Sequence, residues 1–436
     1  MTHPAGAALR RFIISESEAD LTPHAGLGLI GMALNERTNL ASDTEAVSPL
    51  RSDAVSHASI LTCYVALLCL GKSDFEAIHG FREDAYFIEA LGLERVPSEG
   101  ILRQRMDAFA AHYKAAVAAA AIEFLRRSQA ELTPRDNGLM PLDCDVTPLD
   151  NSQSKKEGVS RTYKGEDGYA PMAGYLGQEG YCLELQLRPG SQHCQKGTPE
   201  FLERVLGRAR QLTDAPLLLR LDSGNDAIEN IAVVEAHNEQ DEKAAPVHYL
   251  IKWNPRKESP ERWLAYAEAH GEWSEPRPGK RVALFEVHET RTIDKRGQQL
   301  LVPEIEIEGW WTSLEFDEET IIALYADHGT SEQYHREFKT DLDIERLPSG
   351  KFATNALILA CAQLAYNILR WIGQNGLLGP DAPPRHRAKR LLLRTVMQEL
   401  MYLAARLIQS ARRLKLAFGC PVVPILRRLS TQLTGT

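Results

Sequence analysis

Five polar side chains between residues 325 and 339 fall on one face of a predicted helix. At about 100° per residue, this face carries the side chains of Tyr325, His328, Glu332, Arg336 and Lys339. An amphipathic helix usually has an apolar stripe instead. A single acid flanked by phosphate-binding bases suits a residue that holds a divalent cation beside a nucleic-acid backbone. The alternative is a charged surface helix that only keeps the protein soluble.

A second acidic segment, residues 140–149, reads M-P-L-D-C-D-V-T-P-L and alternates as a strand does. Asp143, Asp145 and Thr147 therefore share one face. Two aspartates on one strand face repel each other unless a positive charge lies between or above them, and a divalent metal ion would supply that charge. The alternation does not distinguish Asp143 from Asp145 as the ligand. An edge strand with a solvated face is the alternative.

A third segment, residues 215–222, reads A-P-L-L-L-R-L-D and has the pattern of a buried strand. It ends on Asp222, which Ser223 and Gly224 follow. α/β sheets present reactive groups where a strand passes into a loop, so Asp222 is a candidate second metal ligand. Alternatively, Asp222 only turns the loop or caps the helix predicted over residues 227–237.

These segments resemble the insertion-sequence transposases of the RNase H-like, Asp-Asp-Glu type. Members of that family often carry a Tyr-x2-Arg-x3-Glu-x6-Lys helix, and Tyr325, Glu332 and Lys339 stand in register with it. The D-x-T motif at Asp145 and the D-S-G motif at Asp222 match the other two acids in the same order. The resemblance implies that Asp145, Asp222 and Glu332 are the catalytic, metal-binding residues. Tyr325, His328, Arg336 and Lys339 are then the expected DNA contacts of this helix. His328 replaces the family's arginine, and a mostly neutral histidine cannot grip a phosphate bidentately.

The resemblance also implies an activity. Two Mg²⁺ ions, which Mn²⁺ could replace, would lie between the three acids and support in-line displacement at phosphorus. The expected reaction is cut-and-paste transposition: cleavage of double-stranded DNA at terminal inverted repeats, then strand transfer into target DNA. Because two DNA ends must be held together, a homodimer in the DNA complex is expected. The alternatives are a non-catalytic DNA-binding protein derived from a transposase and a stand-alone Mg²⁺-dependent nuclease.

The chain of 436 residues, 44% of them hydrophobic, is long enough for several cores. The fold class that we predict is α/β, with an RNase H-like mixed-sheet core. A helical N-terminal DNA-binding domain spans residues 1–135, the core spans 136–252 and 317–375, a β-rich insertion spans 253–316, and a basic helical region spans 376–436. In the insertion, runs at 281–288 and 300–307 with a turn at 294–297 predict a long hairpin.

Further DNA contacts are predicted outside the acidic segments. Ser98 is a helix N-cap signal after Pro97, and the helix that it starts carries Arg103 and Arg105. The phrase around it also resembles the N-terminal region of the transposases, which favours a DNA contact over a solvated face. In the insertion, Trp253 is a candidate for stacking on a displaced base, although tryptophans in a small insertion more often form its core.

Charge and composition bound the remaining possibilities. The net charge is −9, but residues 370–436 hold 12 Lys or Arg against two acids, so a basic tail follows an acidic body. The seven cysteines are scattered singly, which predicts free core thiols in a reducing compartment. No apolar run has the length of a membrane helix, and the N-terminus lacks a signal-peptide core. We therefore expect a bacterial cytoplasmic, nucleoid-associated protein.

Overall fold

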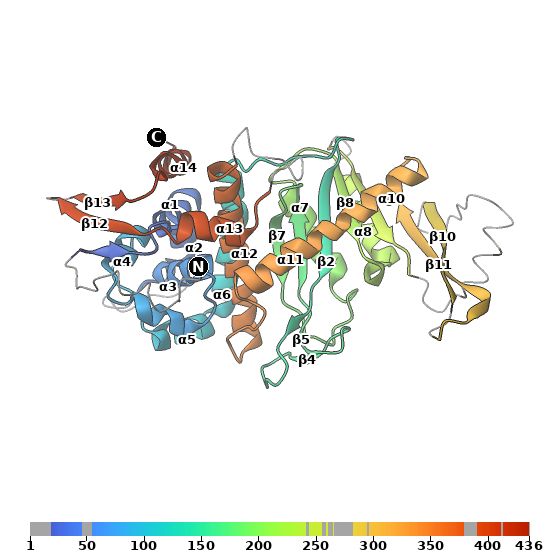
Figure 1. Ribbon diagram of the computed structural model, residues 1–436, viewed down its shortest axis with the longest axis horizontal. Coiled ribbons are helices and arrows are strands. Elements are labelled where there is room, and N and C mark those ends of the chain that lie inside the picture. The colour runs from blue at the N-terminus through green and yellow to red at the C-terminus, as the bar shows by residue number, and fades with distance from the viewer. Residues whose placement is uncertain are drawn as a thin grey trace, which may run out of the picture.

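The computed structural model describes residues 19–45, 55–240, 244–254, 259, 265, 282–293, 296–378, 390–410 and 413–435. A seven-stranded mixed sheet occupies the middle of the molecule (Figure 1). Its strands are β2 (Met140–Val146), β6 (Met172–Leu176), β7 (Tyr181–Gln186), β8 (Leu217–Leu221), β9 (Val247–Lys252), β10 (Val282–Ile293) and β11 (Gln299–Thr312). Their order across the sheet is β10-β11-β9-β8-β2-β6-β7.

The five strands from β7 to β9 have the topology of an RNase H-like fold. β2, β6 and β7 follow one another as an antiparallel meander, while β8 and β9 are parallel to β2 and lie on its other side. Helix α7 (Thr198–Ala209) connects the two halves, and α8 (Ile228–Gln240) connects β8 to β9. The predicted fold class is confirmed.

The β-rich insertion is a long antiparallel hairpin of β10 and β11, as predicted. β11 pairs with β9 through Trp310, Trp311 and Thr312, which extends the sheet beyond its RNase H-like part. The insertion is therefore continuous with the core and projects from its far edge (Figure 1). Trp263 and Trp273 lie outside the described residues.

The two faces of the sheet are covered by different helices. Leu217, Leu219 and Leu221 of β8 pack in one core with residues of α7 and α8. Leu218, between them, packs on the opposite face with Ile321 and Leu324 of α10 (Glu318–Ala326). The alternation of side chains along a strand produces this division. α10 and α11 (Ser331–Arg336) thus cross the face that bears Asp143 and Asp145 (Figure 1).

The helix over residues 325–339 is not regular, so the expectation of one even polar stripe is wrong. A 3₁₀ turn, Asp327–Thr330, separates α10 from α11, and a π-helical turn, Glu337–Asp341, follows α11. These turns change the residues per turn. As a result His328 is buried, Glu332 is exposed and Lys339 is partly buried.

The N-terminal part is helical, as predicted, and it shares one core with a long helix from later in the chain. Its elements are α1 (Leu27–Arg37), α2 (Leu40–Glu45), α3 (His57–Cys69), a 3₁₀ helix (Phe75–Phe81), α4 (Ala85–Leu91), α5 (Glu99–Ala108) and α6 (Ala110–Arg127). Ser98 caps α5 by accepting a hydrogen bond from the Ile101 amide. α12 (Phe352–Gly376) packs against α6, α3 and β7, so it joins these helices to the sheet.

α12 is the one described helix that is, by itself, long and apolar enough to cross a membrane. However, 89% of its most apolar window is buried inside the protein. Helices α5 and α6 pass the same test only as a pair bent by 90°. Burial of this kind is typical of a core helix of a soluble protein.

The C-terminal part differs from the predicted helical tail because it contains a hairpin. α13 (Leu393–Val396) and a π-helical turn (Met397–Met401) precede β12 (Ala405–Ser410) and β13 (Arg413–Phe418), and α14 (Val423–Thr434) follows. β12 also pairs with β1 (Leu21–Thr22). Its alternation of buried Ala405 and Leu407 with exposed Arg406 and half-buried Ile408 is a strand pattern. Arg385, Arg387, Lys389 and Arg412 lie outside the described residues.

All seven cysteines are free thiols, as predicted. Cys63, Cys69, Cys144, Cys182 and Cys361 are buried, which agrees with their prediction as core residues. Cys194 is partly buried, and Cys420 is exposed, so the core assignment is wrong for Cys420.

A buried ion pair fixes the end of the α11 segment to α12. Glu337 and Arg370 each have a side chain only 1% exposed, and Arg370 Nη2 donates to Glu337 Oε2. The Glu337 carboxylate also accepts a hydrogen bond from the Leu393 amide at 3.3 Å. One residue further, the ring of Phe338 stacks on Tyr366 with centroids 4.3 Å apart.

Replacing Arg370 with methionine should therefore destabilise the protein strongly. The variant keeps most of the side-chain volume but leaves the Glu337 charge buried and without its partner, which costs about 3–5 kcal/mol of unfolding free energy. Urea denaturation followed by tryptophan fluorescence measures this loss. The double variant Arg370→Met with Glu337→Leu should recover much of it, because an apolar pair replaces the ionic one. Equal stability of Arg370→Met and the wild type would contradict this role of the pair.

Candidate active site

A buried cluster of charges anchors the α10 to α11 segment on the sheet. Asp143 of β2 lies opposite Arg220 of β8 in the parallel register. Arg220 donates from Nε to Asp143 Oδ1 at 2.6 Å and from Nη2 to Oδ2 at 2.7 Å. Arg220 Nη1 also donates to the Leu324 carbonyl at 2.6 Å, and His328 Nδ1 lies 2.9 Å from Asp143 Oδ1. Two strands and the helix are thus joined through one carboxylate.

This cluster engages only one of the two aspartates of β2. Burial alone would raise the pKa of Asp143, but the charge of Arg220 and the hydrogen bond and charge of His328 lower it to about 2. Both oxygens of Asp143 are occupied by these partners. The positive charge that the sequence pattern predicts beside Asp143 is therefore the guanidinium of Arg220. Since Asp143 is already paired, the geometry favours Asp145 as the metal ligand.

Asp145 is held in one orientation by a histidine. Its Oδ1 accepts a hydrogen bond from the Val146 amide at 2.7 Å, and its Oδ2 lies 3.3 Å from Nε2 of His335. The other ring nitrogen of His335 lies 3.0 Å from the hydroxyl oxygen of Tyr175. Burial raises the pKa of Asp145, but the hydrogen bond and charge of His335 lower it further than burial raises it. The carboxylate is thus ionised.

Asp222 follows β8 and feels the charge of Asp145. Asn225 donates from Nδ2 to Asp222 Oδ1 at 2.6 Å. Burial and, next, the negative charge of Asp145 raise the pKa of Asp222. The two carboxylates therefore lie close enough to repel each other.

Glu332 joins the same region from α11, where its side chain is exposed. The link is Tyr163, in the turn between β4 (Ser160–Arg161) and β5 (Asp167–Tyr169). Partial burial and the charges of Asp145, Asp222 and Glu332 raise the pKa of Tyr163 to about 12. Glu332 also shares α11 with His335, which contacts Asp145 at 3.3 Å.

The acids do not form a closed metal cage as they are placed. Among the residues that the structure describes, no three His, Cys, Asp or Glu side chains could together hold a metal ion. The donor set nevertheless fits Mg²⁺, which takes one or two carboxylates and completes its shell with water and substrate phosphate oxygens. Asp145 and Asp222 repel each other, and a cation between them would relieve that repulsion.

The predicted phosphate-contact residues of the helix fall into different environments. Arg336 is exposed, whereas Lys339 is partly buried with Nζ 3.9 Å from Glu345 Oε2, and burial lowers its pKa. Tyr325 packs beside the rings of Trp310 and His328. His328 is 6% exposed and bound to Asp143, so its prediction as a direct DNA contact is wrong for this conformation.

Three other predicted DNA contacts are engaged within the protein. Trp253 is 3% exposed and belongs to the core of the sheet, so it is not placed to stack on a base. Arg105 lies 2.8 Å from His57 Nδ1, with its guanidinium over the ring of Phe109.

Arg103 is half-exposed and pairs with Glu76 at 2.7 Å and Glu99 at 3.5 Å. Such exposed pairs are weak, so Arg103 can exchange them for a phosphate. Its DNA contact stays a prediction.

Three residues of this site were not predicted from the sequence: Arg220, His335 and Tyr163. The sequence did indicate a buried role for Arg220, because an arginine inside the apolar strand pattern L-L-L-R-L needs a buried acid as its partner. His335 follows Glu332 by three residues and therefore lies near the same helix face. For Tyr163, the sequence contained no indication of a role in the site other than the basic residues near it.

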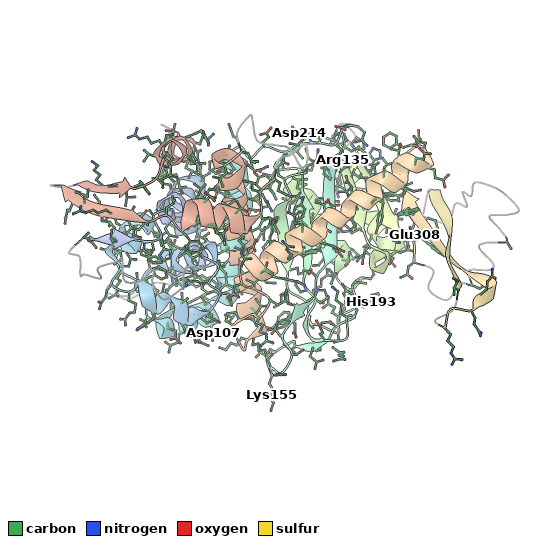
Figure 2. All side chains as sticks on the ribbon, in the orientation of Figure 1. Asp107, Arg135, Lys155, His193, Asp214 and Glu308 are labelled. Atoms are coloured by element: carbon green, nitrogen blue, oxygen red, sulfur yellow. The ribbon has the colours of Figure 1, made fainter. Side chains whose placement is uncertain are left out.

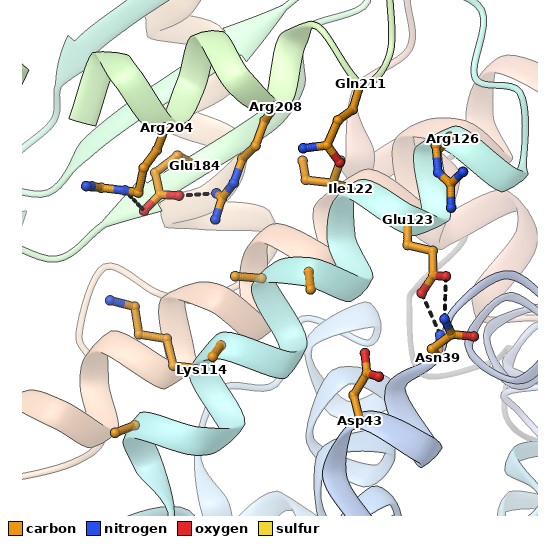
Figure 3. A pocket seen from close by; sticks show the side chains of 14 residues that line it. Asn39, Asp43, Lys114, Ile122, Glu123, Arg126, Glu184, Arg204, Arg208 and Gln211 are labelled. Atoms are coloured by element: carbon orange, nitrogen blue, oxygen red, sulfur yellow. Dashed lines mark hydrogen bonds and ion pairs between the residues drawn. The ribbon is translucent and has the colours of Figure 1, made fainter. Parts of the chain in front are cut away.

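A cavity of about 960 Å³ between α6 and α7 lies apart from the acids (Figure 3). Alanines of α6 form part of its lining. Glu184 pairs with Arg204 and Arg208, and Glu123 accepts from Asn39 (Figure 3). None of Asp145, Asp222 and Glu332 lines this cavity.

The five strands from β7 to β9 define an RNase H-like class of protein. The family model of the transposase DDE domain, group 1, matches residues 11–256 and 290–436, and the chain belongs to this family. The predicted membership among the DDE transposases is thereby confirmed.

A solved cryo-EM structure of a piggyBac transposase synaptic complex with hairpin DNA has a TM-score of 0.44 and 10% sequence identity. That match covers 88% of this chain and 83% of the other chain. No curated protein matches the chain.

The Asp143 cluster predicts a specific dependence of stability on pH. The pKa of Asp143 is about 2 in the folded protein, against 3.8 for a free aspartate, so its ionised form stabilises the fold fully above about pH 4. That contribution disappears as the pH falls towards about pH 2. The stability advantage of the wild type over Asp143→Asn should shrink by about 2 kcal/mol between pH 7 and pH 2.

Urea denaturation of both proteins across this range measures the difference directly. Other groups that titrate in both proteins cancel in the comparison. If the difference in unfolding free energy between the two proteins stayed constant with pH, that result would contradict the placement of Asp143 in a buried ionic cluster.

Proposed function

We propose that this transposase cleaves double-stranded DNA at the terminal inverted repeats of a bacterial insertion sequence and transfers the cut ends into target DNA. The observation that supports this most is the arrangement of the acids. Asp145 lies on β2, Asp222 directly follows the neighbouring strand β8, and Glu332 lies on α11, whose His335 contacts Asp145 at 3.3 Å.

Asp145, Asp222 and Glu332 are the residues that would hold the divalent ions, two Mg²⁺ or their Mn²⁺ substitutes. When bound, the ions would supply an activated water or 3′-hydroxyl and would stabilise the leaving oxygen. Asp145 enters this arrangement already ionised and oriented by His335. Glu332, being exposed, can reorient when DNA arrives.

The bases of the same helix would hold the DNA. Arg336 is exposed beside Glu332, and Lys339 lies one helical turn further along. In this proposal both contact phosphates that flank the attacked one. Because two ends must be cut and joined together, we propose that a homodimer acts on the DNA in the bacterial cytoplasm.

A joining assay separates this function from two others. The purified chain is mixed with labelled DNA of the element's ends, Mg²⁺ and a target plasmid. Joined products support transposition, cut products alone indicate a nuclease, and a gel shift without cutting indicates a non-catalytic DNA-binding protein. EDTA should abolish cutting and joining, and added Mg²⁺ or Mn²⁺ should restore them.

Each of Asp145→Asn, Asp222→Asn and Glu332→Gln should abolish cleavage while leaving DNA binding in place. An amide keeps the shape of the acid but removes the charge that binds the cation. The loss from one such change should be about 10²-fold or more. Gel-based cleavage assays and DNA-binding titrations measure the two effects.

Asp214→Asn is the matched control, because Asp214 is an exposed acid just before the other end of β8 (Figure 2). It should cleave like the wild type. Full activity of Glu332→Gln would overturn the assignment of the third acid.

A further inference from the structure

Tyr163 is an exposed aromatic residue at the edge of the acidic site. Its side chain is 70% exposed, while its hydroxyl oxygen lies 3.5 Å from the carbonyl oxygen of Val146, the residue after Asp145. Because Val146 follows Asp145 directly, the exposed ring borders the place where the attacked phosphate would lie.

A well-formed turn holds this ring in place. β4 and β5 pair through Ser160 with Gly168 and through Arg161 with Asp167. The Thr162 amide donates to the Glu166 carbonyl at 2.8 Å, and the Gly165 amide donates to the Thr162 carbonyl at 3.0 Å. Gly165 has φ +82°, a conformation that glycine adopts without strain. Thr162 is buried, so the turn is anchored next to Tyr163.

The surroundings of the ring favour a nucleotide as its ligand. Arg161 and Lys164, exposed on either side of Tyr163, can hold phosphate groups. The segment that carries β4 and β5 projects from the sheet, with Lys155 at its outer end (Figure 2). An open aromatic face between bases is the arrangement on which unpaired nucleobases stack.

We propose that Tyr163 stacks on the nucleobase next to the phosphate that the acids attack. This inference rests on the proposed DNA-cleaving function of the same site. It moves the stacking role from Trp253, which is buried, to a residue of the β4–β5 turn. Because every base has an aromatic face, the contact would be tolerant of sequence and would favour DNA that is unpaired at the site.

The experiment uses the full chain without metal and a forked DNA duplex with 2-aminopurine at the junction nucleotide. Stacking of the probe on Tyr163 should quench its fluorescence. Tyr163→Leu should abolish the quench and weaken binding of the forked DNA by roughly five- to a hundredfold. It should leave binding of a fully paired duplex unchanged. Tyr163→Phe, which keeps the ring, should behave as the wild type does.

The outcomes separate the stacking from the function on which it rests. Wild-type binding and quenching with loss of both in Tyr163→Leu supports the inference. The same quench in Tyr163→Leu, or no quench in the wild type, overturns it while DNA binding and the proposed function stand. No binding of either DNA by the wild type overturns the proposed function and the inference together. Circular dichroism confirms that Tyr163→Leu is folded, as expected for an exposed side chain.

Discussion

The bidentate ion pair between Arg220 and Asp143 determines where the helix that carries Glu332 can lie. Both side chains are buried between β2, β8 and α10. A charge in such a place must be paired, because the desolvation of an unpaired one costs several kcal/mol. Arg220 reaches the carbonyl of Leu324 and Asp143 reaches His328, so the pair also satisfies groups of the helix. The helix is thereby fixed at the end where it enters the site.

Irregular turns allow the helical segment that runs from α10 to the π-helical turn Glu337–Asp341 to serve three purposes. The 3₁₀ turn directs His328 to the sheet, α11 presents Glu332 to solvent, and the π-helical turn carries Glu337 into the core beside Arg370. A regular helix would place these residues on faces set by 3.6 residues per turn. Fixed at both ends by buried ion pairs, the segment holds α11 over β2 and β8. Asp145 and Asp222 face it from the sheet.

The sequence was sufficient for the order of the main elements, because that order depends on local patterns. Strand alternation placed Asp143 and Asp145 on one face of β2, a buried-strand pattern ended at Asp222, and the Ser98 cap was visible as a motif. The choice of Asp145, Asp222 and Glu332 as metal ligands came from the family resemblance and stays a prediction. Other features depend on contacts between distant residues. Helical periodicity placed His328 towards DNA, but Asp143 lies 185 residues away and holds it in the core. The stacking role predicted for Trp253 was wrong for a similar reason, because β11 packs against Trp253 in the core. The β12–β13 hairpin was not predicted, because its residues belong to a segment that was interpreted as a basic helical tail. Arg220 could be identified as the partner of Asp143 only from the structure, which shows that β2 and β8 are adjacent strands.

The central claim is that Asp145, Asp222 and Glu332 act as one metal site although they lie far apart in the chain. Iron-mediated cleavage of the protein backbone tests it most directly. Fe²⁺ takes the oxygen and nitrogen donors of such sites, and with ascorbate and peroxide it produces hydroxyl radicals that cut the nearest backbone. We predict cuts close to Asp145, Asp222 and Glu332 together, suppressed by excess Mg²⁺ and lost in Asp145→Asn. Cuts confined to other parts of the chain, or cuts unaffected by Asp145→Asn, would contradict the account.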